Sequence, residues 1–207
     1  MKSSGVIFDS ELEAVLRRQA KVELRKRMKA MRRSIPPAAL AVRGDRIVER
    51  VLASRPFAQA RAVALFWPML HLGEVDVRPL DRAARETGKL VAYPSLETDI
   101  DMTLRCAPPE LLEDRGHGFA EPPANAPEVD IDNDLVVIVP ALAVDLSGHR
   151  VGYGRGFYDR LLARIAPPAF AVAVAYDFQV VAELPRAEHD RPVNMLVTDV
   201  RTTAMEG

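Results

Sequence analysis

Apolar residues recur at spacings of four and three along the first part of the chain: Leu16, Ala20, Leu24, Met28, Met31 and Ile35. This spacing places them on one face of a helix. We therefore predict an amphipathic helix from about Asp9 to Arg33, with Asp9 or Ser10 capping its start.

Further helices are predicted after the first one. Pro36-Pro37 ends the first helix, and a second is expected from Pro37 to about Ser54, with a proline in its first turn. Gly44 is the weak point of this second helix, because glycine is a poor helix former. A third helix is expected from Val75 to Thr87.

Between and after these helices, short apolar runs predict buried strands. The clearest is Leu135 to Val139, and the others cover residues 61–67, 90–93, 102–106, 169–176 and 195–198. Residues 107–133 are rich in proline, glycine and acids and are expected to form a long irregular connection, functional or mobile. Strands alternating with helices predict an α/β fold, with one mostly parallel sheet covered by helices on both faces, a Rossmann-like three-layer sandwich.

The length and composition limit the class of protein. A chain of 207 residues with 48% hydrophobic and 28% charged residues fits one folded domain. The net charge of −1 gives no overall attraction to nucleic acid or anionic lipid. No segment is long and apolar enough for a membrane span or a signal peptide. The expectation is a cytoplasmic monomer.

The strongest local motif is Gly152-Tyr153-Gly154-Arg155-Gly156, after the best strand and before a helix that starts at Phe157. Glycines allow the backbone to take positive φ and to approach a ligand closely, and the N–H groups of such a loop suit phosphate. Arg155 adds a charged fork for phosphate oxygens, and Asp159 in the first helical turn could hold a metal ion. The alternative is a tight turn with an acid favourable at a helix start.

A second feature is the charge of the first helix, which carries nine Lys or Arg residues and one acid between Arg17 and Arg33. A solvated face, a few cations facing a nucleotide, or a nucleic-acid surface would each explain it. The helix lacks the interleaved aromatic residues that favour single-stranded nucleic acid.

Two carboxylates outside the glycine motif are also candidates. Glu74 follows the strand that ends at Trp67, where it could meet a substrate or start the next helix. Asp190 precedes the last predicted strand and is a metal ligand or a turn residue. The histidines are scattered, without the spacing of a zinc site.

Four segments, in this order, resemble the 5-formyltetrahydrofolate cyclo-ligase family. They are Lys21-Val-Glu-Leu24-Arg25, Phe66-Trp-Pro68 with Gly73-Glu74-Val75-Asp76, Val139-Pro140 to Asp145 leading into Gly152 to Arg160, and His189-Asp190-Arg191-Pro192-Val193. The resemblance runs from about Lys21 to Asp199. It implies an extension over residues 1–20 and one catalytic domain over residues 21–207.

The resemblance implies a ligase that uses ATP and magnesium to cyclise 5-formyltetrahydrofolate to 5,10-methenyltetrahydrofolate. Arg155 and Asp159 would be catalytic, Asp159 and Asp190 would hold magnesium, and Glu74 and Tyr158 would contact the folate. The ATP would be bound by Lys21, Arg25, Gly152, Tyr153, Gly154, Arg155, Gly156, Phe157 and Tyr158. The alternatives are a nucleotide-binding relative with another substrate and a nucleic-acid-binding module that uses the basic helix.

Overall fold

The computed structural model describes residues 4–98, 100–132 and 134–205. Its centre is a seven-stranded sheet in the order β12-β11-β9-β6-β1-β2-β3, in which the five strands from β11 to β2 run parallel and both edge strands are antiparallel. The strands of this sheet are β1 (Ala62–Ala64), β2 (Leu90–Leu96), β3 (Met102–Cys106), β6 (Leu135–Pro140), β9 (Phe170–Val174), β11 (Met195–Val197) and β12 (Thr202–Ala204). The predicted fold class is confirmed, although β12 adds a strand after the one expected to be last.

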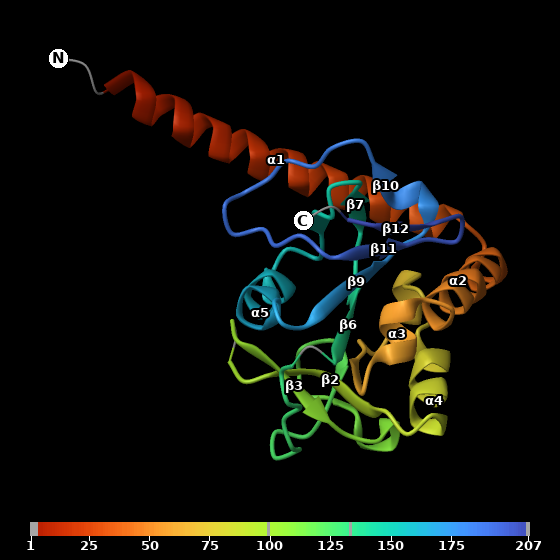
Figure 1. Ribbon diagram of the computed structural model, residues 1–207. Helices are drawn as coiled ribbons and strands as arrows, with labels where there is room; N and C mark the ends of the chain where they lie inside the picture. Colours follow the sequence, from red (N-terminus) through yellow and green to blue (C-terminus); the bar gives the residue numbers. More distant parts are fainter. Residues whose placement is uncertain (1–3, 99, 133, 206–207) are drawn as a thin grey trace.

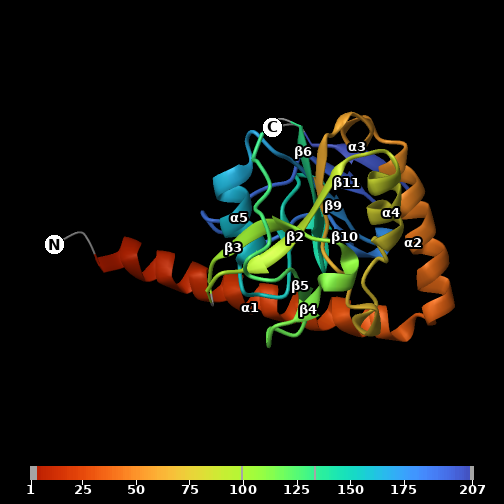
Figure 2. The ribbon, with the colours of Figure 1, turned by 90° about the horizontal axis from the view of Figure 1, so that it is seen from below.

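Helices cover both faces of this sheet. The helices are α1 (Ser4–Ser34), α2 (Pro37–Leu52), α3 (Arg55–Gln59), α4 (Arg78–Glu86) and α5 (Phe157–Ile165). In Figures 1 and 2, α2, α3 and α4 lie on one side of the sheet and α5 on the other. Gly44 does not interrupt α2, because it is buried where the helix approaches the backbone of Asp76.

Both faces of the parallel strands are apolar because each face supports a separate core. In β1, Val63 packs with residues of α2, α3 and α4, whereas Ala62 and Ala64 pack with residues of α5. Val63 pairs with Val91 of β2 and Val136 of β6, so the strands bring matching residues to the same face. This explains why the strands read as continuous apolar runs.

The first helix is longer than predicted. It begins at Ser4, so Asp9 and Ser10 lie inside it and do not cap its start. The apolar stripe packs only in the second half, where Met28 is buried and Leu24 and Met31 are partly buried beside it, whereas Leu16 is 54% exposed. Figure 1 shows the reason, since the N-terminal half of α1 projects beyond the body. The predicted limit of the extension, residue 20, falls within this helix, and residues 1–3 lie outside the described residues.

Short elements surround the main sheet. Strands β7 (Ala143–Asp145), β8 (Arg150–Val151) and β10 (Val180–Val181) form a three-stranded sheet beneath α1. The 3₁₀ helices are η1 (Leu70–Leu72), η2 (Pro109–Leu111) and η3 (Asp177–Gln179). The sequence analysis missed these elements and α3, because segments of two to five residues show no clear periodicity.

The prediction of an irregular connection over residues 107–133 is wrong in part. It contains η2 and a hairpin of β4 (Glu113–Asp114) and β5 (Ala120–Glu121). Glu121 is fully buried and accepts hydrogen bonds from the Leu96 N–H and the Arg115 guanidinium. Buried polar contacts of this kind anchor a segment that composition alone marks as a loop.

Among the helices of the described residues, none combines the length and apolar character needed to cross a bilayer.

Candidate active site

One cavity of about 900 Å³ gathers every site residue that the sequence analysis named. It lies between α1, the carboxyl ends of the central strands, the start of α5 and residues 187–190. In parallel sheets, ligands bind at this end, where loops leave the strands. The named residues that line it are Lys21, Arg25, Glu74, Gly152, Tyr153, Gly154, Arg155, Gly156, Phe157, Tyr158, Asp159 and Asp190.

The glycine loop owes its shape to two of its three glycines. Gly154 and Gly156 have φ of 110° and 69°, whereas Gly152 does not have a positive φ. A Cβ atom at Gly154 would lie 3.4 Å from the guanidinium of Arg25, so this glycine also makes room for α1. Arg155 is exposed at the turn that leads into α5. The loop therefore presents backbone N–H groups and a cation to the cavity.

The first helix contributes cations to the same place. Arg17, Arg18, Lys21 and Arg25 all line the cavity, and Arg25 Nε donates to the carbonyl of Gly152 over 2.9 Å. Nearby Asp190 and Asp159 favour the charged form of Arg25, although burial lowers its pKa overall. Part of the basic helix therefore faces the cavity, and several of its other cations lie on the exposed surface.

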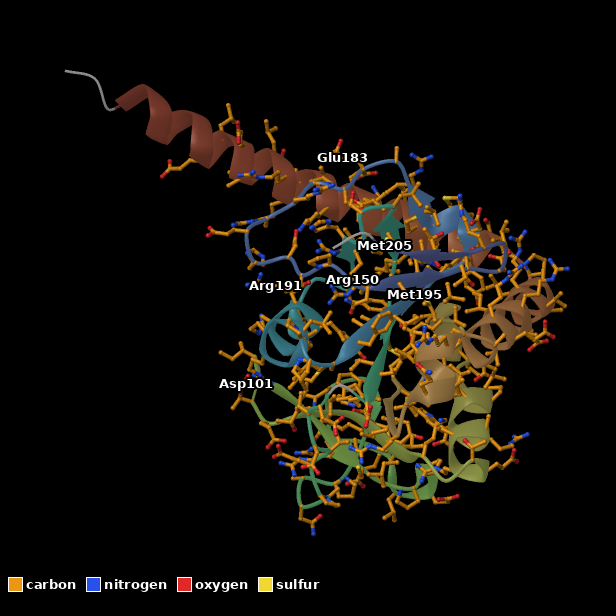
Figure 3. All side chains as sticks on the ribbon, viewed as in Figure 1. Asp101, Arg150, Glu183, Arg191, Met195 and Met205 are labelled. Carbon is orange, nitrogen blue, oxygen red and sulfur yellow. The ribbon has the colours of Figure 1, made fainter. Side chains whose placement is uncertain are left out.

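Asp159 lies in the first turn of α5 and is paired with a residue that sequence analysis missed. Arg150 Nη1 donates to Asp159 Oδ1 over 2.9 Å and to the carbonyl of Arg191 over 3.1 Å. Its side chain is 3% exposed, and it lies beside Arg191 near the start of α5 (Figure 3). Arg150 thus joins the carboxylate to the segment that carries Asp190.

Asp190 forms an ion pair with Lys21 and accepts a hydrogen bond from the Ala187 N–H over 2.7 Å. Burial raises the pKa of Asp190, but the Lys21 ammonium and the Ala187 N–H outweigh it and hold the pKa below its usual value. The carboxylate is therefore ionised at neutral pH. Asp190 thus stabilises the turn that begins at Ala187 and also lines the cavity, and its role as a metal ligand stays a prediction.

Asp159 and Asp190 have the chemistry that magnesium requires. Both offer hard carboxylate oxygens, and the Arg191 N–H, one residue after Asp190, approaches Asp159 Oδ1 at 3.4 Å. Within the described part of the chain, His, Cys, Asp and Glu side chains form no group of three that could hold a metal alone. Two carboxylates completed by phosphate oxygens and water match the usual binding of magnesium with a nucleotide.

Glu74 lies in a different environment of the same cavity. It is 5% exposed, and the Met69 N–H donates to its Oε2 over 2.8 Å. Burial raises the pKa of Glu74, while the N–H of Met69 and the hydroxyl of Tyr153 act in the opposite direction. Asp76, the other acid of this segment, accepts from the N–H and guanidinium of Arg78 and so supports the start of α4.

Apolar and aromatic side chains line the same cavity as Glu74: Phe66, Trp67, Met69, Leu72, Pro94, Met102, Phe119 and Tyr158. Trp67 packs edge-on against Tyr93 with ring centroids 6.1 Å apart. Burial raises the pKa of Tyr158, which stays a neutral hydroxyl. Flat rings fit such a wall, because aromatic side chains offer both edge and face contacts.

The hairpin β4–β5 adds two residues that the sequence analysis did not name. His117 and Phe119 line the cavity, and His117 Nδ1 lies 2.5 Å from Oε1 of the buried Glu121. Three backbone N–H groups, at residues 116–118, donate to Asp114 Oδ1 and fix the turn. The only signal in the sequence was the glycine pair around His117, which indicates a tight turn but not its place.

Comparison with known proteins identifies the family of the chain. The model of the 5-formyltetrahydrofolate cyclo-ligase family matches residues 17–199. The 5-formyltetrahydrofolate cyclo-ligase of Escherichia coli K12 is 31% identical over 179 residues, which is 81% of this chain and 93% of that protein. The enzyme of the same name from Mycolicibacterium smegmatis is 42% identical over 85 residues, covering 41% of this chain and 44% of that protein.

Solved structures give the same result. The Aquifex aeolicus 5,10-methenyltetrahydrofolate synthetase has a TM-score of 0.78 and 32% identity, over 90% of this chain and 93% of that chain. The Mycoplasma pneumoniae 5,10-methenyltetrahydrofolate synthetase, at 18% identity, shares the fold with a TM-score of 0.70 over 86% of this chain and 98% of that chain. The resemblance and the enzyme class inferred from the four motifs are confirmed, and the chain is a ligase that belongs to the 5-formyltetrahydrofolate cyclo-ligase family.

Proposed function

We propose that this chain catalyses the ATP- and magnesium-dependent cyclisation of 5-formyltetrahydrofolate to 5,10-methenyltetrahydrofolate, with release of ADP and phosphate. The observation that carries the proposal is the cavity itself. We call the lining by Lys21, Arg25, residues 152–156, Asp159 and Asp190 its charged end, and we call Glu74 with the apolar and aromatic lining its aromatic end. The first suits a nucleotide phosphate group and the second a flat, partly apolar ring system.

The chemistry explains why both ends are needed. An amide oxygen is a poor leaving group, so the formyl oxygen attacks the γ-phosphorus of ATP and ADP leaves. The nitrogen at position 10 attacks the activated formyl carbon, loses its proton, and closes the ring as phosphate departs. Phosphoryl transfer of this kind depends on positioning and on neutralisation of charge.

The residues of the charged end would bind and orient the triphosphate. Backbone N–H groups of residues 152–156 donate to phosphate oxygens, and Arg155, Arg25 and Lys21 supply positive charge. Asp159 and Asp190, now paired with Arg150 and Lys21, would be the two carboxylates that hold magnesium. Magnesium, when bound, neutralises charge on the transferred phosphoryl group.

The residues of the aromatic end would bind the folate. Trp67 and Phe119 contact the ring system, and the Glu74 carboxyl forms hydrogen bonds with its polar edge. Tyr158 lines the same cavity near Glu74 and would contact both ligands. His117 and Phe119 help to exclude water from this end.

An absorbance assay tests the proposal. Purified protein is mixed with 5-formyltetrahydrofolate, and the near-ultraviolet band of the methenyl product is followed with ATP and magnesium together and with each omitted. We expect product only in the complete mixture. No product, with ATP still raising the melting temperature, would support the alternative of a nucleotide-binding relative with another substrate.

A further inference from the structure

The turn of the hairpin β4–β5 carries an imidazole into the cavity wall. His117 lines the cavity, and 24% of its side chain is exposed. Its Nδ1 lies 2.5 Å from Oε1 of Glu121, the fully buried residue that ends β5. Because a carboxylate only accepts hydrogen bonds, Nδ1 is the donor of this pair, and Nε2 is left as the acceptor nitrogen of the neutral ring.

Glu121 is itself fixed on the main sheet. Its second oxygen, Oε2, accepts from the N–H of Leu96 at the end of β2 over 2.7 Å, and Arg115 Nη1 lies 3.5 Å from it. Strand β5 lies beside β2, as Figure 2 shows. One oxygen therefore anchors the carboxylate and the other binds the imidazole. A buried carboxylate in this position holds a histidine in one tautomer and stabilises the ring when it takes up a proton.

The backbone and a neighbouring ring also hold His117 in place. Asp114 Oδ1 accepts from the N–H groups of residues 116–118 over 2.9 to 3.0 Å, which fixes the turn. The ring of Phe119 lies at a centroid distance of 6.2 Å, tilted by 32°. In the part of the chain that the structure describes, Nε2 has no hydrogen-bond partner. An oriented ring with one available acceptor nitrogen is the arrangement that a general base needs.

The proposed reaction releases a proton inside this cavity, since the nitrogen at position 10 loses its hydrogen when the ring closes. Few of the lining side chains can accept this proton. Lysine and arginine have no acceptor atom, and the two aspartates of the charged end are paired with cations. Glu188 and His189 line the cavity but are exposed to water.

Glu74 and His117 remain as candidate acceptors. Glu74 Oε2 already accepts from the Met69 N–H, and the proposed function uses this carboxyl to bind the polar edge of the folate. His117 differs because the carboxylate of Glu121 compensates the positive charge that protonation of the ring creates. The contacts therefore favour His117.

We propose that His117, oriented by Glu121, is the base that takes this proton. The lone pair of the nitrogen at position 10 forms the bond to the activated formyl carbon. Nε2 then binds the proton, the electrons of the broken N–H bond stay on the nitrogen, and phosphate leaves with the electrons of its C–O bond. His117 returns the proton to water through the exposed part of its side chain. Glu121 is a positioning residue in this step, and the inference rests on the proposed function for its substrate.

The test separates ring closure from phosphoryl transfer in a single turnover. His117→Asn keeps a donor near the position of Nδ1 and removes Nε2. We expect ADP to form at close to the wild-type rate, whereas the methenyl band should appear about a hundredfold more slowly. In His117→Ala, added imidazole should raise the rate of ring closure about tenfold. His71→Asn, at an exposed histidine outside the cavity lining, is the control and should change neither rate.

Nitrogen NMR of the His117 ring tests the role of Glu121 without any turnover, with the signals assigned by their loss in His117→Asn. We expect the proton of the neutral ring on Nδ1 in the wild type. Glu121→Gln keeps an acceptor for the Leu96 N–H but loses the charge, so the ring should populate both tautomers and ring closure should slow about tenfold. A wild-type ring with its proton on Nε2 would overturn the positioning role, even if Glu121→Gln does not fold.

The remaining outcomes separate this inference from the proposed function. Methenyl formation at the wild-type rate in His117→Asn would overturn the inference. Equal slowing of ADP and methenyl formation would overturn it too, since His117 would then act in folate binding rather than in proton transfer. A wild-type protein that makes no methenyl product would instead reject the proposed function, and with it this proton transfer, while the ring-nitrogen spectrum still decides the contact with Glu121.

Discussion

The carboxylates at the two ends of the cavity differ in their partners and in the direction of their pKa shifts. At the charged end, Asp159 is paired with Arg150 and Asp190 with Lys21, and these pairs lie near the exposed glycine loop. At the aromatic end, Glu74 is buried with one N–H donor and no directly paired cation among the described residues. The pKa of Asp190 is lowered, whereas the pKa of Glu74 is raised.

This difference suits one cavity to the binding of two chemically different ligands. Carboxylates paired with cations can exchange those cations for a metal and release the cations to phosphate. A buried carboxylate instead selects between ligands by hydrogen bonding. A ligand without a matching donor leaves the carboxylate unpaired, and binding is then weakened by the cost of keeping that group away from water. The charged end is therefore expected to depend on charge, and the aromatic end on shape and protonation.

The largest expected effect comes from Asp159→Asn, which removes one charge without changing shape. We expect kcat to fall between about a hundredfold and a thousandfold, as for loss of a group that stabilises charge in the transition state. Melting curves should show that the fold survives, because Asp159 is partly exposed. Asp45→Asn, on the exposed side of α2, is the control. Turnover near the wild-type rate would remove Asp159 from the mechanism.

The next effect is expected from Arg155→Ala at the glycine loop. Loss of a charge-assisted hydrogen bond to phosphate should raise the KM for ATP about tenfold or more and abolish most turnover at low ATP. Arg82→Ala, an exposed arginine of α4 far from the cavity, should change neither value. If the KM for folate rose instead, the assignment of the two ends would be reversed.

A smaller effect, on stability, is expected from a substitution that strains the backbone of the glycine loop. Gly154→Ala forces a side chain into φ of 110° and against Arg25, so it should destabilise the fold by about 1 kcal/mol. Gly152→Ala is the matched comparison, because nothing lies within 4 Å of its added Cβ and its φ is not positive. Thermal unfolding of both variants would check this, and equal melting temperatures would contradict it.

The smallest effect is a difference in how stability depends on pH. Because the pKa of Glu74 in the folded chain lies above its ordinary value of 4.5, wild-type stability decreases as pH rises through that pKa. Glu74→Gln should therefore melt higher than wild type at neutral pH and equal to it in acid.

Asp190→Asn should behave in the opposite way. The pKa of Asp190 in the folded chain is below its ordinary value of 3.8, so its ionised form stabilises the chain above that value. The variant should melt below wild type at neutral pH, and the difference should shrink as pH falls through the lowered pKa. If Glu74→Gln and Asp190→Asn changed the melting temperature in the same direction at neutral pH, the contrast between the two ends would be refuted.

The sequence predicted the parallel sheet, because Leu135 to Val139 and similar runs are apolar on both faces. It also predicted the charged end, since glycines, a cation and an acid lie within one short motif. Arg150 and Phe119 were missed, because their roles depend on contacts with residues far along the chain. The start of α1 was misplaced because its N-terminal half continues as a helix without packing on the body.

The central claim, that nucleotide and folate occupy opposite ends of one cavity, is tested most directly by binding. Dissociation constants for ATP with magnesium and for 5-formyltetrahydrofolate would be measured separately by calorimetry in Asp159→Asn and Glu74→Gln. We predict that Asp159→Asn weakens ATP binding about tenfold or more and spares folate, whereas Glu74→Gln weakens folate binding and spares ATP. Equal loss of both ligands in both variants would contradict the account.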